Sequence, residues 1–335
     1  MKNRAVPSLY ERSFPNLILY LFLIGTFLLF QPAASAQQST SSAKANNSLK
    51  IFMIWDMEGT SGLFTKEHVW YWEEGVRKEI ADEGRDLLIA DVNSACRAAL
   101  NADVDELIIC DAHHGGNNIQ IDKMLSDSRI TYLVKSVGFQ DKKRRWLPGL
   151  DESVDGIMLM AHHAKAGTEG AFLPHTWSGQ WADFIINGQS IGEIGIETCY
   201  AGYWNIPLIL VQGDEAACRE ADQQFPGIVS VVVKHAESYD KSSGLDAQTA
   251  RQLTADKITE AVNKLRTGCF KPFKPEMPAT VTILMKSSEA ARKAARKPGV
   301  QRIDSCTVGA QIERQCDIIR WITGNGLDMP EQVIR

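Results

Sequence analysis

The sequence has no Cys-x-x-Cys pair, which excludes both the usual thiolate zinc spacing and a thioredoxin-like motif. Its seven cysteines are an odd number in a chain of 335 residues, unlike the dense framework of a small disulfide-rich domain. Cys96, Cys110 and Cys199 lie in apolar surroundings and are expected to be buried thiols. Cys306 and Cys316 are a candidate disulfide pair.

A strong net charge is also lacking. The formal charge of -5 suggests neither a nucleic-acid partner nor a basic membrane-binding surface. With 44% hydrophobic and 23% charged residues, the composition is globular and allows a large core or two domains. The one basic stretch that stands out, residues 289–302, is expected to be a solvated helix face, with binding of an anionic partner as the alternative.

A short apolar run occupies residues 17–30 near the N-terminus. Basic residues precede it, and a small-x-small pattern at Ala34 and Ala36 follows it, which is the order of a secretory signal peptide. The run is too short to cross a bilayer comfortably, so we expect no stable membrane anchor. Residues 1–36 are therefore predicted to be a cleaved signal of a periplasmic or secreted protein, and the Ser-rich residues 37–48 a disordered linker.

Apolar runs alternate with helical patterns along the rest of the chain, which predicts an α/β fold with a mainly parallel sheet covered by helices. The expected strands are 49–55, 104–114, 130–136, 156–164, 206–214, 228–236 and 279–287, and the expected helices are 71–102, 191–205, 246–265 and 310–325. The Pro-containing residues 271–278 are the best boundary between a main α/β domain, 49–270, and a smaller α+β C-terminal part, 271–335, packed on it.

Carboxylate and imidazole side chains follow three of the expected strands. They are Asp56 and Glu58 after the first strand, His113 and His114 after the second, and His162 and His163 after the strand that starts near residue 156. In open α/β sheets, ligands bind outside the carboxyl ends of the strands. Asp56 and Glu58 are two residues apart, so in an extended chain they share a face and repel each other unless a cation lies between them.

The types of side chain narrow the choice of cation. Imidazole with carboxylate, and without thiolate, suits zinc and also accepts manganese, cobalt or iron. Enough ligands gather for two metal ions that share a carboxylate. Taken alone, each acid could be a helix cap or a solvated turn, and each histidine an ordinary loop residue. The coincidence at three strand ends is what favours a metal site.

Several stretches resemble, in order and spacing, the D-aminopeptidase family associated with bacterial dipeptide-transport operons. They are "WDMEGTSG", "CDAHHGGNN", "AHHAKAG", "PHTWSG" and "INGQSIGEIGIE" followed by "GYWNIPLILVQGD". The resemblance runs from about residue 49 to the C-terminus. It implies a dinuclear zinc peptidase of α/β fold, with two zinc ions per subunit, that forms a homo-oligomer, a ring-like decamer.

The resemblance also implies roles for individual residues. Asp56 matches the carboxylate that bridges both zinc ions. Glu58 and His163 match ligands of one ion, and His113 and Glu193 match ligands of the other. His175 matches a catalytic histidine that is not a ligand.

Neighbouring residues leave alternatives open. His114 and His162 are assigned supporting roles, although His162 and His163 are easily exchanged in this assignment. Glu197 lies one helical turn after Glu193 and is the fallback ligand. Asp183 and Asp214 are both candidates to bind the amine of a substrate.

The function expected from these observations is that of an exported zinc-dependent aminopeptidase. It would hydrolyse the N-terminal peptide bond of short peptides and favour D-amino acids, D-Ala in particular. The export signal departs from the familiar cytosolic members of the family. A dinuclear metallo-phosphoesterase, with Lys165 as the only nearby cationic residue, is one alternative. An exported protein that binds zinc or peptides without turnover is the other.

The protein purified from its native host is expected to begin near Gln37, because the signal pattern ends with the small residues before it. N-terminal sequencing or intact mass spectrometry measures this directly. A mass equal to that of the uncleaved chain would contradict export through a cleaved signal.

Overall fold

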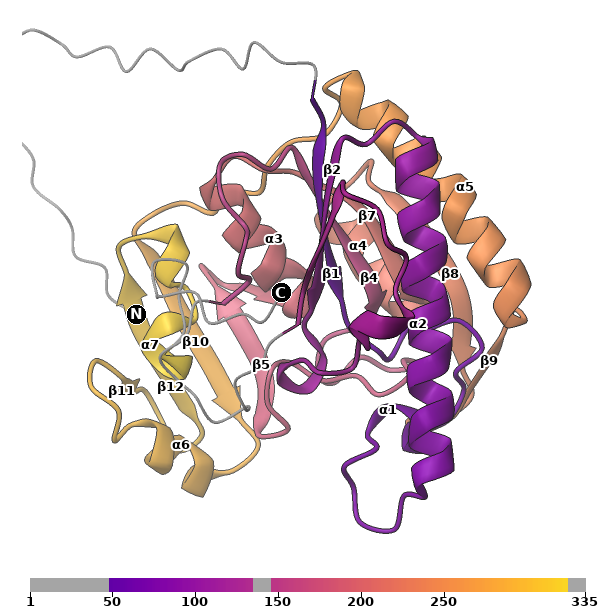
Figure 1. Ribbon diagram of the computed structural model, residues 1–335. Helices are drawn as coiled ribbons and strands as arrows, with labels where there is room; N and C mark the ends of the chain where they lie inside the picture. The colour runs from indigo at the N-terminus through magenta and orange to yellow at the C-terminus, as the bar shows by residue number, and fades with distance from the viewer. Residues whose placement is uncertain (1–47, 135–145, 325–335) are drawn as a thin grey trace, which may run out of the picture. The chain divides into compact units, whose positions relative to one another are not determined.

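The computed structural model describes residues 48–134 and 146–324, which belong to one compact unit (Figure 1). The expected signal peptide and nearly all of the expected linker lie outside the described residues. Within the described ranges, no helix combines the length and the apolar character that crossing a membrane requires.

The main sheet has seven strands and is mostly parallel, which confirms the predicted α/β class. Its strand order is β3 (Ile130–Leu133), β2 (Glu106–Asp111), β1 (Lys50–Trp55), β4 (Gly156–His162), β7 (Leu208–Asp214), β8 (Val229–Ala236) and β9 (Ser242–Gly244). Every neighbouring pair is parallel except β8 and β9, which pair antiparallel.

Strand β1 lies inside the sheet and is buried on both faces, which explains its unbroken apolar sequence. Phe52 and Ile54 point into one core, and Ile51 and Met53 point into the other. Helices α2 (Lys78–Asn101) and α5 (Ala247–Arg266) cover the second core, and α3 (Glu193–Tyr203) and α4 (Glu215–Gln224) the first (Figure 1).

A second, antiparallel sheet packs on the α3 side of the main sheet. Its order is β11 (Gln301–Arg302), β12 (Thr307–Ile312), β10 (Ala279–Met285), β5 (Trp181–Ile186) and β6 (Gln189–Ile191). Strand β10 of the C-terminal part pairs with β5 of the main part, so the two parts share this sheet. The boundary at 271–278 stays a prediction, and any division there would cut through shared hydrogen bonds.

The remaining elements are short. They are α1 (Lys66–Val69), α6 (Ser288–Ala294), α7 (Arg320–Thr323) and the 3-10 turns η1 (His113–Gly115), η2 (Ile121–Lys123) and η3 (Gln315–Asp317). The basic stretch that begins at residue 289 includes α6, where Arg292 and Lys293 are exposed, as expected of a solvated face.

Two expected helices differ from the structure. The helix expected over 71–102 begins only at Lys78, because Gly75 has a φ of 88°, outside the right-handed helical region. The helix expected over 310–325 is wrong: strand β12 runs to Ile312, and within the described residues only the short η3 and α7 follow. Pairing of β12 with β10 in continuous register overrides the helical pattern of the sequence.

Each of the seven cysteines remains a thiol, so the candidate pair Cys306 and Cys316 is not formed. Cys96, Cys110 and Cys199 are buried, as expected. Burial raises the pKa of Cys96 to about 12, which keeps this thiol protonated and unreactive.

The turn after β1 approaches β4 and β7 closely at Gly59. A Cβ atom there would lie 2.6 Å from the carbonyl carbon of Ala161 and 2.7 Å from the Cα atom of Gly213. The Gly59 N–H also donates to the Ala161 carbonyl at 2.7 Å. The turn therefore has no room for a side chain between these backbones.

Gly59→Ala is expected to lower the free energy of unfolding by about 1–3 kcal/mol, the usual cost of overpacking. Urea denaturation of the wild type and the variant measures this difference. Gly179→Ala is the matched control, because a Cβ atom at Gly179 meets nothing within 4 Å. Equal stability of Gly59→Ala and Gly179→Ala would contradict the close approach.

Candidate metal centre

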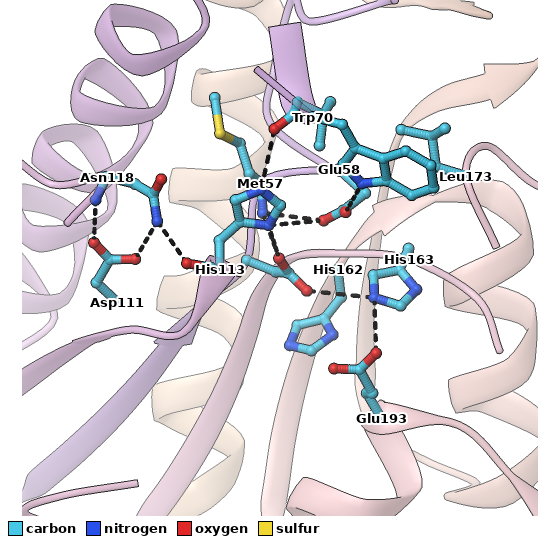
Figure 2. A network of polar contacts seen from close by, with 12 residues as sticks. Met57, Glu58, Trp70, Asp111, His113, Asn118, His162, His163, Leu173 and Glu193 are labelled. Carbon is cyan, nitrogen blue, oxygen red and sulfur yellow. Dashed lines mark hydrogen bonds and ion pairs between the residues drawn. The ribbon is translucent and has the colours of Figure 1, made fainter. Parts of the chain in front are cut away.

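Three adjacent strands deliver acidic and imidazole side chains to one edge of the main sheet (Figure 2). Asp56 and Glu58 follow β1, His113 follows β2 in the turn η1, and His163 follows β4. The order of the sheet reverses between β1 and β4, and ligands of open α/β sheets bind at such a switch point.

Two further residues come from outside the main sheet. Glu193 is the first residue of α3, and only Gly192 separates it from the short strand β6 of the second sheet. His175 lies in the loop between β4 and β5. The Trp177 N–H donates to Glu193 Oε1 at 2.7 Å and so ties this loop to the start of α3. The structure thus brings together the five residues assigned as ligands and His175.

The cluster is buried on one side and open on the other. Glu58, His113 and His163 are buried beside Asp56. The side chains of His175 and Glu193 keep 22% and 15% of their surface exposed. The solvent-facing side of the cluster is therefore that of His175 and Glu193.

Within the described residues, the ligand atoms form groups that share Asp56. Asp56 Oδ1 lies 2.6 Å from His113 Nδ1, and Asp56 Oδ2 lies 3.3 Å from His163 Nε2. Glu58 Oε2 lies 3.4 Å from His113 Nδ1, and Glu193 Oε1 lies 3.4 Å from His163 Nε2. Asp56 is therefore placed where one carboxylate could contact two cations.

This grouping differs from the one that the resemblance implied. It pairs Glu58 with His113 and Glu193 with His163, instead of Glu58 with His163 and Glu193 with His113. The reason is the strand order: β2 lies on one side of β1 and β4 on the other, so each oxygen of Asp56 faces a different imidazole. Glu58 and His163 come together only in a third group, with His175.

Each of the three histidines in the cluster is oriented by a backbone carbonyl. The bonds are His113 Nε2 to Val69 O at 3.1 Å, His163 Nδ1 to Ala164 O at 2.9 Å and His175 Nδ1 to Leu173 O at 2.9 Å. A carbonyl only accepts, so these ring nitrogens carry the proton. The other nitrogen of each ring then faces carboxylate oxygens, which accept hydrogen bonds and do not donate them. Two acceptors at such distances need a proton or a metal ion between them.

The electrostatics of the cluster favour positive charge. Burial raises the pKa of Asp56, but hydrogen bonds with His113 and His163 outweigh it and hold this pKa well below its ordinary value. Burial lowers the pKa of His113, but Glu58 and Asp56 outweigh it and hold this pKa well above the ordinary range.

His163 is the clearest sign that the residues fit a metal ion. Burial lowers its pKa, but Asp56 and Glu193 outweigh burial and raise the pKa well above its ordinary value. Its Nε2 atom is buried and makes no hydrogen bond of good geometry, although two carboxylates lie near it. Such an atom suits coordination, and the donor set of imidazole and carboxylate suits zinc.

The neighbouring candidates have other partners. His162 Nε2 lies 3.0 Å from Glu197 Oε2, and both side chains are buried and belong to none of the three groups. The ring of His114 stacks on Trp72, with ring centres 3.7 Å apart. Glu193, not the fallback Glu197, faces the cluster.

The two candidates for binding a substrate amine also make structural hydrogen bonds. Asp214 is buried and accepts from the backbone N–H groups of Ala217 and Phe172, both at 2.8 Å. Asp183 accepts from the Ser190 hydroxyl at 2.6 Å and from the Phe184 N–H at 2.9 Å.

Sequence reasoning missed the residues that hold the ligands. Trp70 Nε1 donates to Glu58 Oε1 at 3.1 Å. Asp111 accepts from the Asn118 backbone N–H at 2.6 Å, and the Asn118 side chain donates to the His113 carbonyl at 2.7 Å (Figure 2). The short spacing of "CDAHHGGNN" was a signal for this looped turn, whereas nothing in the sequence links Trp70 to Glu58.

Comparison with known proteins supports one family. A family model described as D-aminopeptidase matches residues 49–324. A D-aminopeptidase from Bacillus subtilis (strain 168) is 27% identical over 254 residues, which cover 76% of this chain and 87% of that protein. The solved structure of the "Zn-dependent D-aminopeptidase DppA from Bacillus subtilis, a self-compartmentalizing protease" has a similar fold. Its TM-score is 0.73 at 24% identity, over 82% of this chain and 95% of that chain.

Asp56→Asn is expected to lose more bound zinc than Glu58→Gln, His113→Ala, His163→Ala or Glu193→Gln. The reason is that Asp56 belongs to two groups of ligand atoms, and an amide carries no charge to hold two cations together. Zinc-to-protein ratios after dialysis measure the loss.

Asp183→Asn is the matched control, because Asp183 lies outside the three groups. This variant should keep the zinc content of the wild type. Full zinc content in Asp56→Asn would show that this carboxylate does not bridge.

Proposed function

The chain belongs to the D-aminopeptidase family and is a hydrolase of the metallo-aminopeptidase type, and from this premise we propose that it removes the N-terminal residue of short peptides with two zinc ions. The observation that carries the proposal is the shared carboxylate: Asp56 faces His113 with one oxygen and His163 with the other. The proposed ligands are Asp56, Glu58, His113, His163 and Glu193. The solved relative is described as Zn-dependent, which supports the choice of metal.

The chemistry that such a pair of ions supplies is polarisation of the scissile carbonyl and a lower pKa of the attacking water. The side chains of the protein orient the peptide and exclude bulk water. Burial of Glu58 and His163 keeps bulk water away from the inner side of the cluster. The exposed edge at Glu193 and His175 leaves room for the peptide.

His175 is the proposed general acid–base residue. Its Nδ1–H is fixed by the Leu173 carbonyl, so Nε2 is the atom available for proton transfer. Nε2 lies 4.0 Å from Glu58 Oε1 and 3.8 Å from Glu193 Oε1, farther than the other imidazoles lie from their carboxylates. The ring stacks on His163, with centres 3.8 Å apart. From this place, Nε2 of His175 can accept a proton from the attacking water and deliver it to the leaving amine.

The finer features of the function are also proposals. The description of the family supports a preference for a D-residue at the N-terminus, and we propose D-Ala. The signal-peptide pattern, which lies outside the described residues, supports a periplasmic or secreted location. The solved relative is described as self-compartmentalizing, which supports a homo-oligomer, and we propose the decameric ring that the resemblance implies.

The phosphoesterase alternative has little support. A phosphoesterase would need a cationic side chain free to bind a phosphoryl oxygen, and Lys165 was the candidate. Its Nζ atom instead hydrogen-bonds the Ser190 hydroxyl.

The test uses purified protein of measured zinc content on D-Ala-Gly, L-Ala-Gly and a generic phosphoester. We expect hydrolysis of D-Ala-Gly, slower hydrolysis of L-Ala-Gly and none of the phosphoester. His175→Ala should lower kcat by about 10²- to 10⁴-fold, the usual contribution of general acid–base catalysis, with zinc content and melting temperature unchanged.

His235→Ala is the matched control, because His235 is exposed and pairs with Glu215, outside the cluster. A loss of zinc in His175→Ala would make His175 a ligand. A decrease in kcat of less than about tenfold would contradict the acid–base role of His175. Turnover of the phosphoester alone would contradict the proposed function.

A further inference from the structure

Aromatic rings gather beside the metal-ligating cluster. The Trp70 indole donates to Glu58, and its ring meets the ring of His175 edge-on, with centres 5.7 Å apart and planes at 87° (Figure 2 shows Trp70 beside Glu58). Two more rings adjoin Trp70: Trp72, 6.4 Å away, and Tyr239, 6.3 Å away between ring centres. We call Trp70, Trp72 and Tyr239 the aromatic rim.

The outer rings of the rim are exposed to solvent. Trp72 is 43% exposed and Tyr239 is 51% exposed, two of the six large hydrophobic side chains exposed in the described ranges. Trp72 is held by stacking on His114 and lies 5.5 Å from the ring of His113. Adjoining rings that stay in water next to a reactive site mark a surface for an apolar ligand.

Backbone hydrogen bonds fix the rim relative to His175. The Leu173 N–H donates to the Tyr239 carbonyl at 2.8 Å, and the Leu173 carbonyl accepts from His175. The Lys66 N–H donates to the Asp240 carbonyl at 3.1 Å, which joins the segment of Trp70 to that of Tyr239. The rim and the proposed acid–base residue are therefore parts of one loop assembly.

The charge around the rim decides which group it binds. An aromatic face binds either a cation or a neutral apolar group. Lys66 Nζ already lies over the Trp70 ring, 5.1 Å from its centre, and forms an ion pair with Glu73 at 2.7 Å. The position of a cation over Trp70 is therefore already taken by Lys66. A neutral, flat side chain can instead contact the exposed rings of Trp72 and Tyr239.

We propose that the aromatic rim binds an apolar, preferably aromatic, side chain of the substrate, carried by the residue after the cleaved bond. The assignment rests on the proposed function, in which the N-terminal residue is D-Ala and carries only a methyl group. The larger side chain is then that of the second residue. The favoured substrates are peptides of the type D-Ala-Phe.

The kinetic test compares D-Ala-Gly with D-Ala-L-Phe and D-Ala-D-Phe. In the wild type, the better phenylalanine peptide should have a kcat/KM about fivefold above that of D-Ala-Gly, as expected of ring–ring contacts. Trp72→Ala and Tyr239→Ala should each reduce this ratio to below about twofold, mainly through KM. Trp72→Leu, which keeps an apolar side chain without an aromatic face, should reduce it as well.

Tyr203→Ala is the matched control. Tyr203 is also exposed, but it is the last residue of α3, ten residues and about 15 Å along the helix from Glu193. In Tyr203→Ala, the ratio of kcat/KM for the phenylalanine peptide to that for D-Ala-Gly should equal the wild-type ratio. An unchanged ratio in all three rim variants, or no preference for phenylalanine in the wild type, would overturn the assignment of the rim while leaving the proposed function standing.

A binding measurement separates the failure of the rim from the failure of the proposed function. Isothermal titration of the zinc-loaded protein with D-Phe, L-Phe and glycine requires no turnover. Binding of phenylalanine that disappears in Trp72→Leu, in a protein that hydrolyses no peptide, would support the rim and contradict the aminopeptidase. The absence of both binding and turnover would contradict both proposals.

Discussion

The crowding of Asp56, Glu58 and Glu193 at one edge of the sheet is the constraint on which the rest of the site depends. Asp56 lies within 4.8 Å of both other acids, measured between ligand atoms. Two like charges about 4 Å apart repel by about 4 kcal/mol at an effective dielectric constant of 20, a large share of the stability of a domain. The three imidazoles reduce this repulsion, because their nitrogens can share a proton or a metal ion with the acids. Positive charge at this edge, from protonated imidazole or from a bound cation, therefore offsets the repulsion between the acids.

The scaffold holds that edge rigidly. Gly59 allows the turn after β1 to lie against the backbones of β4 and β7. Lys234, fully buried, donates to the Glu58 carbonyl at 2.7 Å and to the Leu63 carbonyl. Burial lowers the pKa of Lys234 to about 7, against the opposing effect of Asp91 and Asp214. The turn that carries Asp56 and Glu58 is thus fixed from two directions, by the close backbone approach at Gly59 and by the hydrogen bonds of Lys234.

Sequence patterns predicted the centre of the fold better than its periphery. Strands β1, β2 and β4 are buried on both faces, so each reads as a continuous apolar run, and the polar residues after them stand out. The roles of Glu193 and His175 were predicted only from the family resemblance. Neither residue follows a strand of the main sheet directly: Glu193 follows the second sheet, and His175 lies in a loop. The sharing of Asp56 between His113 and His163 depends on strand order, which no local pattern contains. The wrong prediction of a helix over 310–325 also results from pairing between distant strands, because the first residues of this range belong to β12. Trp70 and Tyr239 meet across more than 150 positions of sequence, beyond the reach of any motif.

The central claim is that two cations share Asp56, one beside Glu58 and His113 and the other beside His163 and Glu193. Anomalous diffraction at the zinc absorption edge, from crystals of the zinc-loaded protein, tests it most directly. The account predicts two anomalous peaks, on opposite sides of the Asp56 carboxylate, each next to its own imidazole. A single peak, or two peaks of which one lies away from Asp56, would contradict it.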